Sequence, residues 1–277
     1  MDLRSEIKDA VDFIRTKTRA TPAIGIILGT GLGALADEIE KDLSISYDEI
    51  PHFPVSTVES HAGRFLFGKL GGKDVIAMQG RFHFYEGYDL RQVTFPVRVM
   101  KEIGVKILIV SNAAGGLNPQ FEIGDLVMIT DHINFQTANP LTGPNDETLG
   151  PRFPDMYNCY DRELQDLAER TAIDEKVPLK KGVYVGVTGP NLETGAEYRF
   201  LRTIGGDLVG MSTVPEVIVA RHQGTRVLGF SLATDMGLPD AMEPCSHEKI
   251  IAAAAKAEPK LTKLVKKTVE RISIDQS

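Results

Sequence analysis

AIGIILGTGLGALADEIE (residues 23–40) joins an apolar run, a glycine-rich turn and a helical pattern. The run Ile24–Leu28 is apolar on both faces, which is typical of a strand inside a sheet that helices cover. Gly29, Gly31 and Ala34 fit the G-x-G-x-x-A spacing of a dinucleotide-binding loop. The stretch therefore predicts an α/β fold and a turn whose backbone N–H groups can hold an anion.

Short apolar strands and helical patterns alternate along the rest of the chain. We expect strands at Ile24–Leu28, Arg64–Phe67, Asp74–Met78, Ile107–Val110, Leu126–Ile129, Val183–Val187, Leu208–Met211 and Arg226–Leu232. We expect helices at Ser5–Lys17, Leu90–Ile103, Asp161–Ile173, Thr194–Ile204, Thr213–His222 and His247–Arg271. Pro96 predicts a kink or a later start in the second helix. Thr213 and Glu216 predict a capping box.

The alternation predicts one α/β domain over residues 1–277, with a largely parallel or mixed sheet flanked by helices. The sequence contains no linker rich in Gly, Pro and Ser that would divide it. The longest irregular region, residues 134–160, holds four prolines. A loop of that length inside a compact domain is usually functional.

Composition excludes several classes of protein. The net charge of −7 over 277 residues argues against nucleic acid as a partner. No apolar run reaches roughly 18 residues, so we expect no membrane span. The charged N-terminal segment lacks the pattern of a signal peptide. Cys159 and Cys245 lack the spacing of metal ligands, so we expect reduced thiols in a cytoplasmic protein.

The glycine loop alone leaves three interpretations open. A dinucleotide site needs a long helix after the loop and an acidic residue about 20 residues further on. Asp48 and Glu49 have about that distance, but Pro51 and Pro54 interrupt the segment where the fold should continue. The loop can instead hold another anion, with the Thr30 hydroxyl as a donor, or form a tight turn without a ligand.

A second polar segment, QGRFHFYEGY (residues 79–88), follows a predicted strand. Arg81, His83 and Tyr85 alternate, so an extended stretch would place them on one face. Arginine with a histidine and a hydroxyl makes a good clamp for an oxyanion. The plainer alternative is that Arg81 pairs with Glu86.

Two further segments lie at strand ends. SHAGR (residues 60–64) contains His61, and VSNAAGG (residues 110–116) ends an apolar strand in small residues that let a ligand approach the backbone. Ligands of α/β sheets bind at the carboxyl ends of the strands. Several such segments in one chain therefore predict a binding site at that edge.

Seven segments carry a resemblance to a known family: GTGLG, HAG, QGRFHFYEGY, SNAAGG, TGPNLETGAE, GMSTVPEVIVARH and SLATD occur in this order between residues 29 and 235. Together they resemble the purine nucleoside phosphorylases of the homotrimeric type (nucleoside phosphorylase family 1). The resemblance implies reversible phosphorolysis of purine (deoxy)ribonucleosides, giving free base and pentose 1-phosphate in purine salvage. It also implies a central mixed β-sheet curled toward a barrel, a homotrimer, and no metal or organic cofactor, with phosphate as a substrate.

The resemblance also implies the roles of individual residues. The phosphate site would comprise Thr30, His61, Arg81, His83, the backbone N–H of Ala113 and Ser212. The nucleoside site would comprise Tyr85, Asn112, Phe153, Leu192, Glu193, Val209, Met211, Thr234, Asp235 and His247. Within these sets, Glu193 would bind N1–H of a 6-oxopurine, His247 the 5′-hydroxyl, and Phe153 the ribose of a neighbouring subunit. His83, Glu193 and Asp235 would act in catalysis.

Asp235 departs from the family pattern, because relatives that cleave inosine and guanosine usually carry Asn there. An ionised Asp can only accept hydrogen bonds, so it could assist N7 of the base only after gaining a proton. Asp resembles the 6-aminopurine enzymes, including methylthioadenosine phosphorylase, whereas Glu193 favours a 6-oxopurine and His247 disfavours a methylthio group. We expect an inosine/guanosine type and keep a 6-aminopurine type as the alternative. Leu192 replaces a common aromatic and predicts weaker stacking on the base.

Two other classes of protein compete with this hypothesis. An NAD-dependent oxidoreductase would leave Arg81, His83 and Glu193 without a role. A nucleoside-binding module without turnover would be expected to lack one of the phosphate-binding side chains, and Arg81 and His83 are both present.

Overall fold

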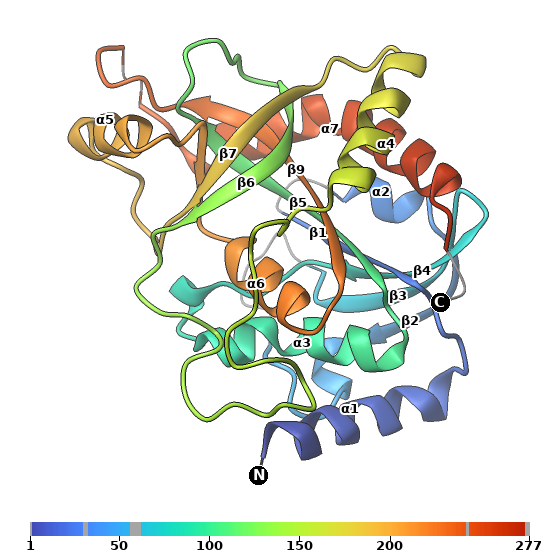
Figure 1. Ribbon diagram of the computed structural model, residues 1–277. Coiled ribbons are helices and arrows are strands. Elements are labelled where there is room, and N and C mark those ends of the chain that lie inside the picture. The colour runs from blue at the N-terminus through green and yellow to red at the C-terminus, as the bar shows by residue number, and fades with distance from the viewer. Residues whose placement is uncertain (1, 30–32, 56–61, 242–243, 275–277) are drawn as a thin grey trace.

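The computed structural model describes residues 2–29, 33–55, 62–241 and 244–274 (Figure 1). Thr30 and His61, both predicted phosphate ligands, lie outside these ranges. The described residues form one α/β unit, in which nine strands make a single mixed sheet in the order β2-β3-β4-β1-β5-β8-β7-β6-β9.

The elements follow the predicted alternation. The strands are β1 (Ile24–Leu28), β2 (Glu40–Ser46), β3 (Arg64–Leu70), β4 (Lys73–Gln79), β5 (Ile107–Gly116), β6 (Leu126–Asn134), β7 (Lys180–Gly186), β8 (Leu208–Gly210) and β9 (Arg226–Met236). The helices are α1 (Leu3–Lys17), α2 (Ala34–Asp37), α3 (Leu90–Ile103), α4 (Arg162–Asp174), α5 (Gly195–Thr203), α6 (Val214–His222) and α7 (His247–Arg271). Two short 3-10 helices are η1 (Tyr47–Glu49) and η2 (Phe84–Glu86).

Part of the sheet closes into a barrel. Strand β5 pairs with β8 and also with β9, so β5, β8, β7, β6 and β9 form a closed ring of five strands. Strands β1, β4, β3 and β2 continue outward from β5 as an open extension. Pairing is mixed, because β5 runs parallel to β9 but antiparallel to β8. The predicted mixed sheet curled toward a barrel is confirmed.

Helices cover both faces of this sheet (Figure 1). Helices α1, α3 and α6 pack on one face and share a core with side chains such as Ile14 and Phe65. Helices α2, α4 and α7 pack on the other face around side chains such as Ile26 and Leu264. All five residues of β1 are buried, which explains its uninterrupted apolar sequence.

Helix α3 has its predicted bounds, whereas the start of α6 differs from prediction. Helix α3 begins at Leu90 and contains Pro96, so a later start is wrong; Asp89 and Gln92 form a capping box that fixes the start. The predicted capping box of Thr213 and Glu216 is also wrong. Thr213 has a φ of 70° and its side chain does not cap α6, because its hydroxyl and the Glu216 carboxylate both contact Arg81.

The segment after the glycine loop differs from a dinucleotide-binding unit. Helix α2 has only four residues, and it is followed by β2, which pairs antiparallel with β3. The first backbone N–H of α2, at Ala34, donates to the carboxylate of Glu258 in α7 (2.5 Å). Strand β2 escaped prediction because it is an edge strand whose only buried residue is Ile45.

Candidate active site

A cavity of about 450 Å³ opens where β5, β8 and β9 of the barrel meet the segments before α5 and at the start of α7. Its lining includes these predicted site residues: Arg81, His83, Tyr85, Asn112, Ala113, Leu192, Glu193, Val209, Met211, Ser212, Thr234, Asp235 and His247. Residues from the whole length of the chain therefore meet in one place.

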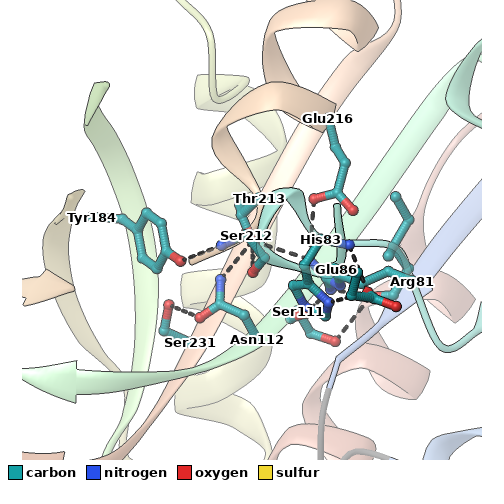
Figure 2. Close-up of polar contacts among 11 residues, drawn as sticks. Arg81, His83, Glu86, Ser111, Asn112, Tyr184, Ser212, Thr213, Glu216 and Ser231 are labelled. Carbon is teal, nitrogen blue, oxygen red and sulfur yellow. Dashed lines mark hydrogen bonds and ion pairs between the residues drawn. The ribbon is translucent and has the colours of Figure 1, made fainter. Parts of the chain in front are cut away.

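Arg81 is held at the inner wall of the cavity. Its side chain is 1% exposed, and its Nη1 donates to Glu216 Oε2 (3.1 Å) and to Thr213 Oγ1 (3.2 Å) (Figure 2). Nη2 donates to the backbone carbonyls of Ile27 in β1 (3.4 Å) and of Ser111 in β5. These contacts fix the guanidinium beside the cavity and balance its buried charge.

His83 is oriented by Glu86. The Glu86 Oε1 atom accepts from the His83 backbone N–H (2.8 Å) and lies 2.9 Å from ring Nδ1. A carboxylate can only accept, so Nδ1 carries the hydrogen. The His83 ring also stacks on Tyr85, with ring centroids 4.7 Å apart.

The local backbone around these residues is not the extended stretch that the alternation predicted. Phe84–Glu86 form η2, and the backbone of His83, just before it, is extended. The three side chains nonetheless line the same cavity. The turn of η2 is what brings the Glu86 carboxylate back to the His83 ring.

A network of hydrogen bonds joins β5, β7 and β9 to the start of α6 (Figure 2). The Asn112 amide donates to Thr213 Oγ1 (2.8 Å), and its carbonyl accepts from Ser231 Oγ (2.7 Å). The Ser212 backbone N–H donates to Tyr184 Oη (3.3 Å), and its Oγ lies 3.2 Å from Thr213 Oγ1. These bonds fix the position of Ser212 at the start of α6.

Two half-buried carboxyl groups, Glu193 and Asp235, also line the cavity. Burial raises the pKa of Glu193, the nearby Asp235 raises it further, and a hydrogen bond from Tyr198 opposes the rise. Burial also raises the pKa of Asp235, against a hydrogen bond from Thr234. Both acids therefore bind protons more readily than carboxyls in water.

Asp235 lies close to the backbone of β5. A Cβ placed on Gly115 would be 3.1 Å from Asp235 Oδ2, so a larger residue there would crowd the carboxyl. The Thr234 hydroxyl lies 3.0 Å from Asp235 Oδ1 and 3.3 Å from the carbonyl of Ala114. Thr234 has a single hydrogen for these two oxygen neighbours.

His247 is the first residue of α7, and Ser246 caps that helix through the backbone N–H of Lys249 (3.4 Å). Ile250, one turn further on, also lines the cavity. Both residues belong to the same face of α7.

Phe153 does not line this cavity. Its ring is 88% exposed, and the Arg152 guanidinium lies 5.7 Å from the ring centroid. The irregular region that carries it contains no helix or strand between Asn134 and Arg162 in the described structure.

Sequence reasoning assigned no role to several lining residues: Ala114, Gly115, Pro190, Gly210 and Ile250. Most of them neighbour a predicted residue inside the motifs already quoted. Ile250 could have been found from helical periodicity, since it lies three residues after His247.

Two sets of lining residues suit different chemistry. Arg81, His83 and Ser212 offer charged and neutral donors for an anion, whereas Glu193 and Asp235 suit a ring that presents N–H groups or needs a proton. Among the described residues, no group of three or more His, Cys, Asp or Glu side chains could hold a metal ion. None of the helices within the described ranges combines the length and apolar character that a membrane crossing needs.

Comparisons with known proteins agree with this geometry. Residues 23–270 match the model of the phosphorylase superfamily. The chain is 55% identical to purine nucleoside phosphorylase 1 of Bacillus subtilis, over 96% of this chain and 98% of that protein. It is 48% identical to purine nucleoside phosphorylase of Bos taurus, over 94% and 92%. The Schistosoma mansoni purine nucleoside phosphorylase in complex with adenosine has a TM-score of 0.93, at 43% identity and 98% coverage of both chains. A Schistosoma mansoni purine nucleoside phosphorylase in complex with inosine has a TM-score of 0.93, at 42% identity and 98% coverage of both chains.

Proposed function

The chain belongs to the phosphorylase superfamily, and we propose that it cleaves purine (deoxy)ribonucleosides with phosphate, releasing the free base and pentose 1-phosphate. One observation carries this proposal beyond the comparisons. A single cavity joins Arg81, His83 and Ser212 to Glu193 and Asp235. Donors for phosphate and carboxyls for a purine therefore lie within reach of one bound nucleoside.

Phosphate binds at the end of the cavity formed by Arg81, His83, Ser212 and the N–H of Ala113. The ion pair between Arg81 and Glu216 supports this role, because it fixes the guanidinium in position before phosphate binds. Thr30 and His61 stay predictions for the same phosphate site.

The purine binds at the carboxyl end, with Glu193 accepting from N1–H and Leu192 against the ring. Tyr85, Asn112, Val209 and Met211 surround the pentose and the base, with Thr234 beside Asp235. His247 donates to or accepts from the 5′-hydroxyl. The lining of the cavity by all of these side chains supports their roles.

The reaction breaks the bond between C1′ and N9 and forms a bond between a phosphate oxygen and C1′. Positive charge develops on the sugar, where bound phosphate balances it, and the electron pair of the broken bond moves onto the purine. Asp235 transfers its proton to N7 of the departing base and is left as a carboxylate. The raised pKa of Asp235 supports this role, because it favours the protonated acid.

The preferred substrates are 6-oxopurine nucleosides, of the inosine and guanosine type. An ionised Glu193 accepts from N1–H of these bases but faces an acceptor in adenine. The alternative, a 6-aminopurine preference, rests on Asp235, whose carboxylate could accept from the exocyclic amine. The similar Schistosoma structures bear on both substrate types, since one is in complex with inosine and another with adenosine.

Further parts of the proposal concern the whole protein. Residues 1–277 form one domain, and the protein assembles as a homotrimer in which Phe153 reaches the pentose of a neighbouring subunit. Its 88% exposure supports this role, because it leaves the ring free to contact a second subunit. Phosphate acts as a substrate, and no metal or organic cofactor is used. A cytoplasmic location stays a prediction.

Release of free base from inosine, guanosine, adenosine and methylthioadenosine, each with and without phosphate, tests this function. We expect phosphate-dependent release that is fastest with inosine and guanosine. Release at the same rate without phosphate would refute the proposal.

A further inference from the structure

Thr213 follows Ser212 in a strained turn between β8 and α6. Its φ of 70° and ψ of −53° are values that a β-branched residue rarely adopts. The backbone N–H of Val214 donates to the carbonyl of Ser212 (2.7 Å), so these three residues form the strained, positive-φ type of γ-turn. Thr213 is fully buried and is not among the residues that line the cavity. A backbone conformation of this kind persists where surrounding contacts hold it.

The Thr213 hydroxyl is where those contacts meet (Figure 2). Its oxygen accepts from Arg81 Nη1 (3.2 Å) and from the amide of Asn112 (2.8 Å). The Asn112 carbonyl is occupied by Ser231 Oγ (2.7 Å), so the amide N–H group is the part that faces Thr213. A guanidinium can only donate. A hydroxyl oxygen has two lone pairs, and these two N–H donors fill both of them.

The direction of the hydrogen bond between Thr213 and Ser212 follows from this count. The two hydroxyl oxygens lie 3.2 Å apart, and either could donate by distance alone. Because both lone pairs of Thr213 Oγ1 are occupied, its single hydrogen points to Ser212 Oγ. Ser212 therefore accepts from Thr213, and the hydrogen of Ser212 is left for another acceptor.

A phosphate oxygen in the cavity is the acceptor that fits this hydrogen, because Ser212 lines the cavity. Tyr184 is the competing acceptor, since its hydroxyl interacts with the Ser212 side chain and also accepts from the Ser212 backbone N–H (3.3 Å). A charged phosphate oxygen is a stronger acceptor than a phenol oxygen. Successive hydrogen bonds polarise one another, so the run that begins at Ser231 and passes through Thr213 strengthens Ser212 as a donor.

We propose that Thr213 is a positioning residue whose hydroxyl fixes Ser212 as a hydrogen-bond donor to phosphate and thereby tightens phosphate binding. The proposal rests on the function proposed above. Thr213 also contacts Arg81, but the guanidinium keeps its ion pair with Glu216 (3.1 Å) when the Thr213 hydroxyl is removed. The effect of removing the hydroxyl should therefore pass through Ser212.

The test is Thr213→Val, which removes the hydroxyl and keeps the β-branched shape. The measurements are kcat, the KM for phosphate and for inosine, the thermal midpoint, and the Kd of inorganic phosphate by calorimetry without nucleoside. We expect the KM and the Kd for phosphate to rise about tenfold, because Ser212 is no longer held as a donor to a charged group. The KM for inosine at saturating phosphate should not change. An unchanged Kd for phosphate in folded Thr213→Val would overturn the proposal.

Thr213→Ser is the conservative variant, because it keeps the hydroxyl. Its Kd for phosphate should stay within about twofold of the parent value. A loss in Thr213→Ser as large as that in Thr213→Val would show that the shape of the side chain matters and not its hydroxyl. Should Thr213→Val fail to fold, Thr213→Ala repeats the comparison, since it removes the hydroxyl together with the β-branch that is strained at positive φ.

A double-mutant cycle with Ser212→Ala separates an effect through Ser212 from an effect through Arg81. In the Ser212→Ala background, Thr213→Val should raise the KM for phosphate by less than about twofold, because the hydroxyl that it orients is already absent. The same loss in both backgrounds would overturn the role of Ser212 in the proposal.

Thr171→Val is the matched control. Thr171 is buried in α4 outside the cavity, and its hydroxyl also accepts from an arginine, Arg271 (3.4 Å), and donates to the carbonyl of Leu167 (2.8 Å). This change should lower the thermal midpoint and leave the Kd for phosphate unmoved. A rise equal to that in Thr213→Val would overturn the proposal, because loss of any buried hydroxyl would then have the same effect.

Failure of the proposed function would look different. A parent enzyme that releases base without consuming phosphate would refute that function. The calorimetric Kd of phosphate for the parent and for Thr213→Val would still decide whether Thr213 positions Ser212.

Discussion

Replacing Asp235 with Asn tests the chemistry that separates this chain from relatives with Asn at that position. The Asn amide donates to N7 at every pH, whereas Asp235 donates only while it holds its proton. The two side chains have nearly the same size, so Asn fits the space that Asp235 occupies beside Gly115. The substitution therefore changes the pH dependence of the donor with little change in packing.

The magnitude follows from the titration of one group. Above the raised pKa of Asp235, the protonated fraction falls tenfold for each pH unit. The ratio of kcat/KM for inosine, Asp235→Asn over parent, should therefore rise about tenfold per pH unit on the alkaline side. Two pH units above the midpoint, the variant-to-parent ratio of kcat/KM should be about a hundredfold higher than the same ratio at acidic pH.

The assay is steady-state release of hypoxanthine from inosine at saturating phosphate across pH, with adenosine in parallel. Taking the ratio of variant to parent cancels the titration of phosphate and of groups that the two proteins share. In the parent, adenosine should gain on inosine as pH rises, because an ionised Asp235 accepts from the 6-amino group. A variant-to-parent ratio that does not change with pH would refute the role of Asp235 as a proton donor.

Substitutions at three further residues probe separate parts of the account. Glu193→Gln should lower kcat/KM for inosine about tenfold and that for adenosine much less, since it exchanges a charged acceptor for a neutral one; equal losses in steady-state assays would contradict its contact with N1–H. Phe153→Ala should raise the KM for inosine with an unchanged thermal midpoint, because the ring is 88% exposed in one chain; an unchanged KM would rule out its contact with pentose. Glu258→Ala should destabilise the fold by about 1 kcal/mol in urea unfolding, because it removes the acceptor for the Ala34 N–H, whereas Glu258→Gln should recover most of the loss. Equal destabilisation by both changes at Glu258 would show that the acceptor oxygen is not what matters.

Apolar pattern predicted the frame of the molecule. Strand β1 has the predicted bounds, and helix α7 begins at His247 and ends at Arg271 as expected. The side chains of β1 are buried continuously and those of α7 with helical period, so their burial appears in the sequence as a pattern of apolar residues. Strand β2 has no such apolar pattern, because it is an edge strand with one buried residue.

Contacts between distant residues could not be predicted in the same way. Glu216 looks like a helix-capping residue in sequence, yet it pairs with Arg81, 135 residues away, because the barrel brings α6 to the end of β4. Tyr184 carries no motif signal, yet its hydroxyl accepts from the backbone N–H of Ser212, 28 residues away. The motifs identified the side chains that line the cavity, whereas the fold supplies the residues that hold them.

Phosphorus-31 NMR of the reaction of inosine with inorganic phosphate tests the central claim most directly. The account predicts that phosphate is consumed in step with hypoxanthine formation and that ribose 1-phosphate appears in equal amount. Hypoxanthine accompanied by free ribose, with the phosphate signal unchanged, would contradict it.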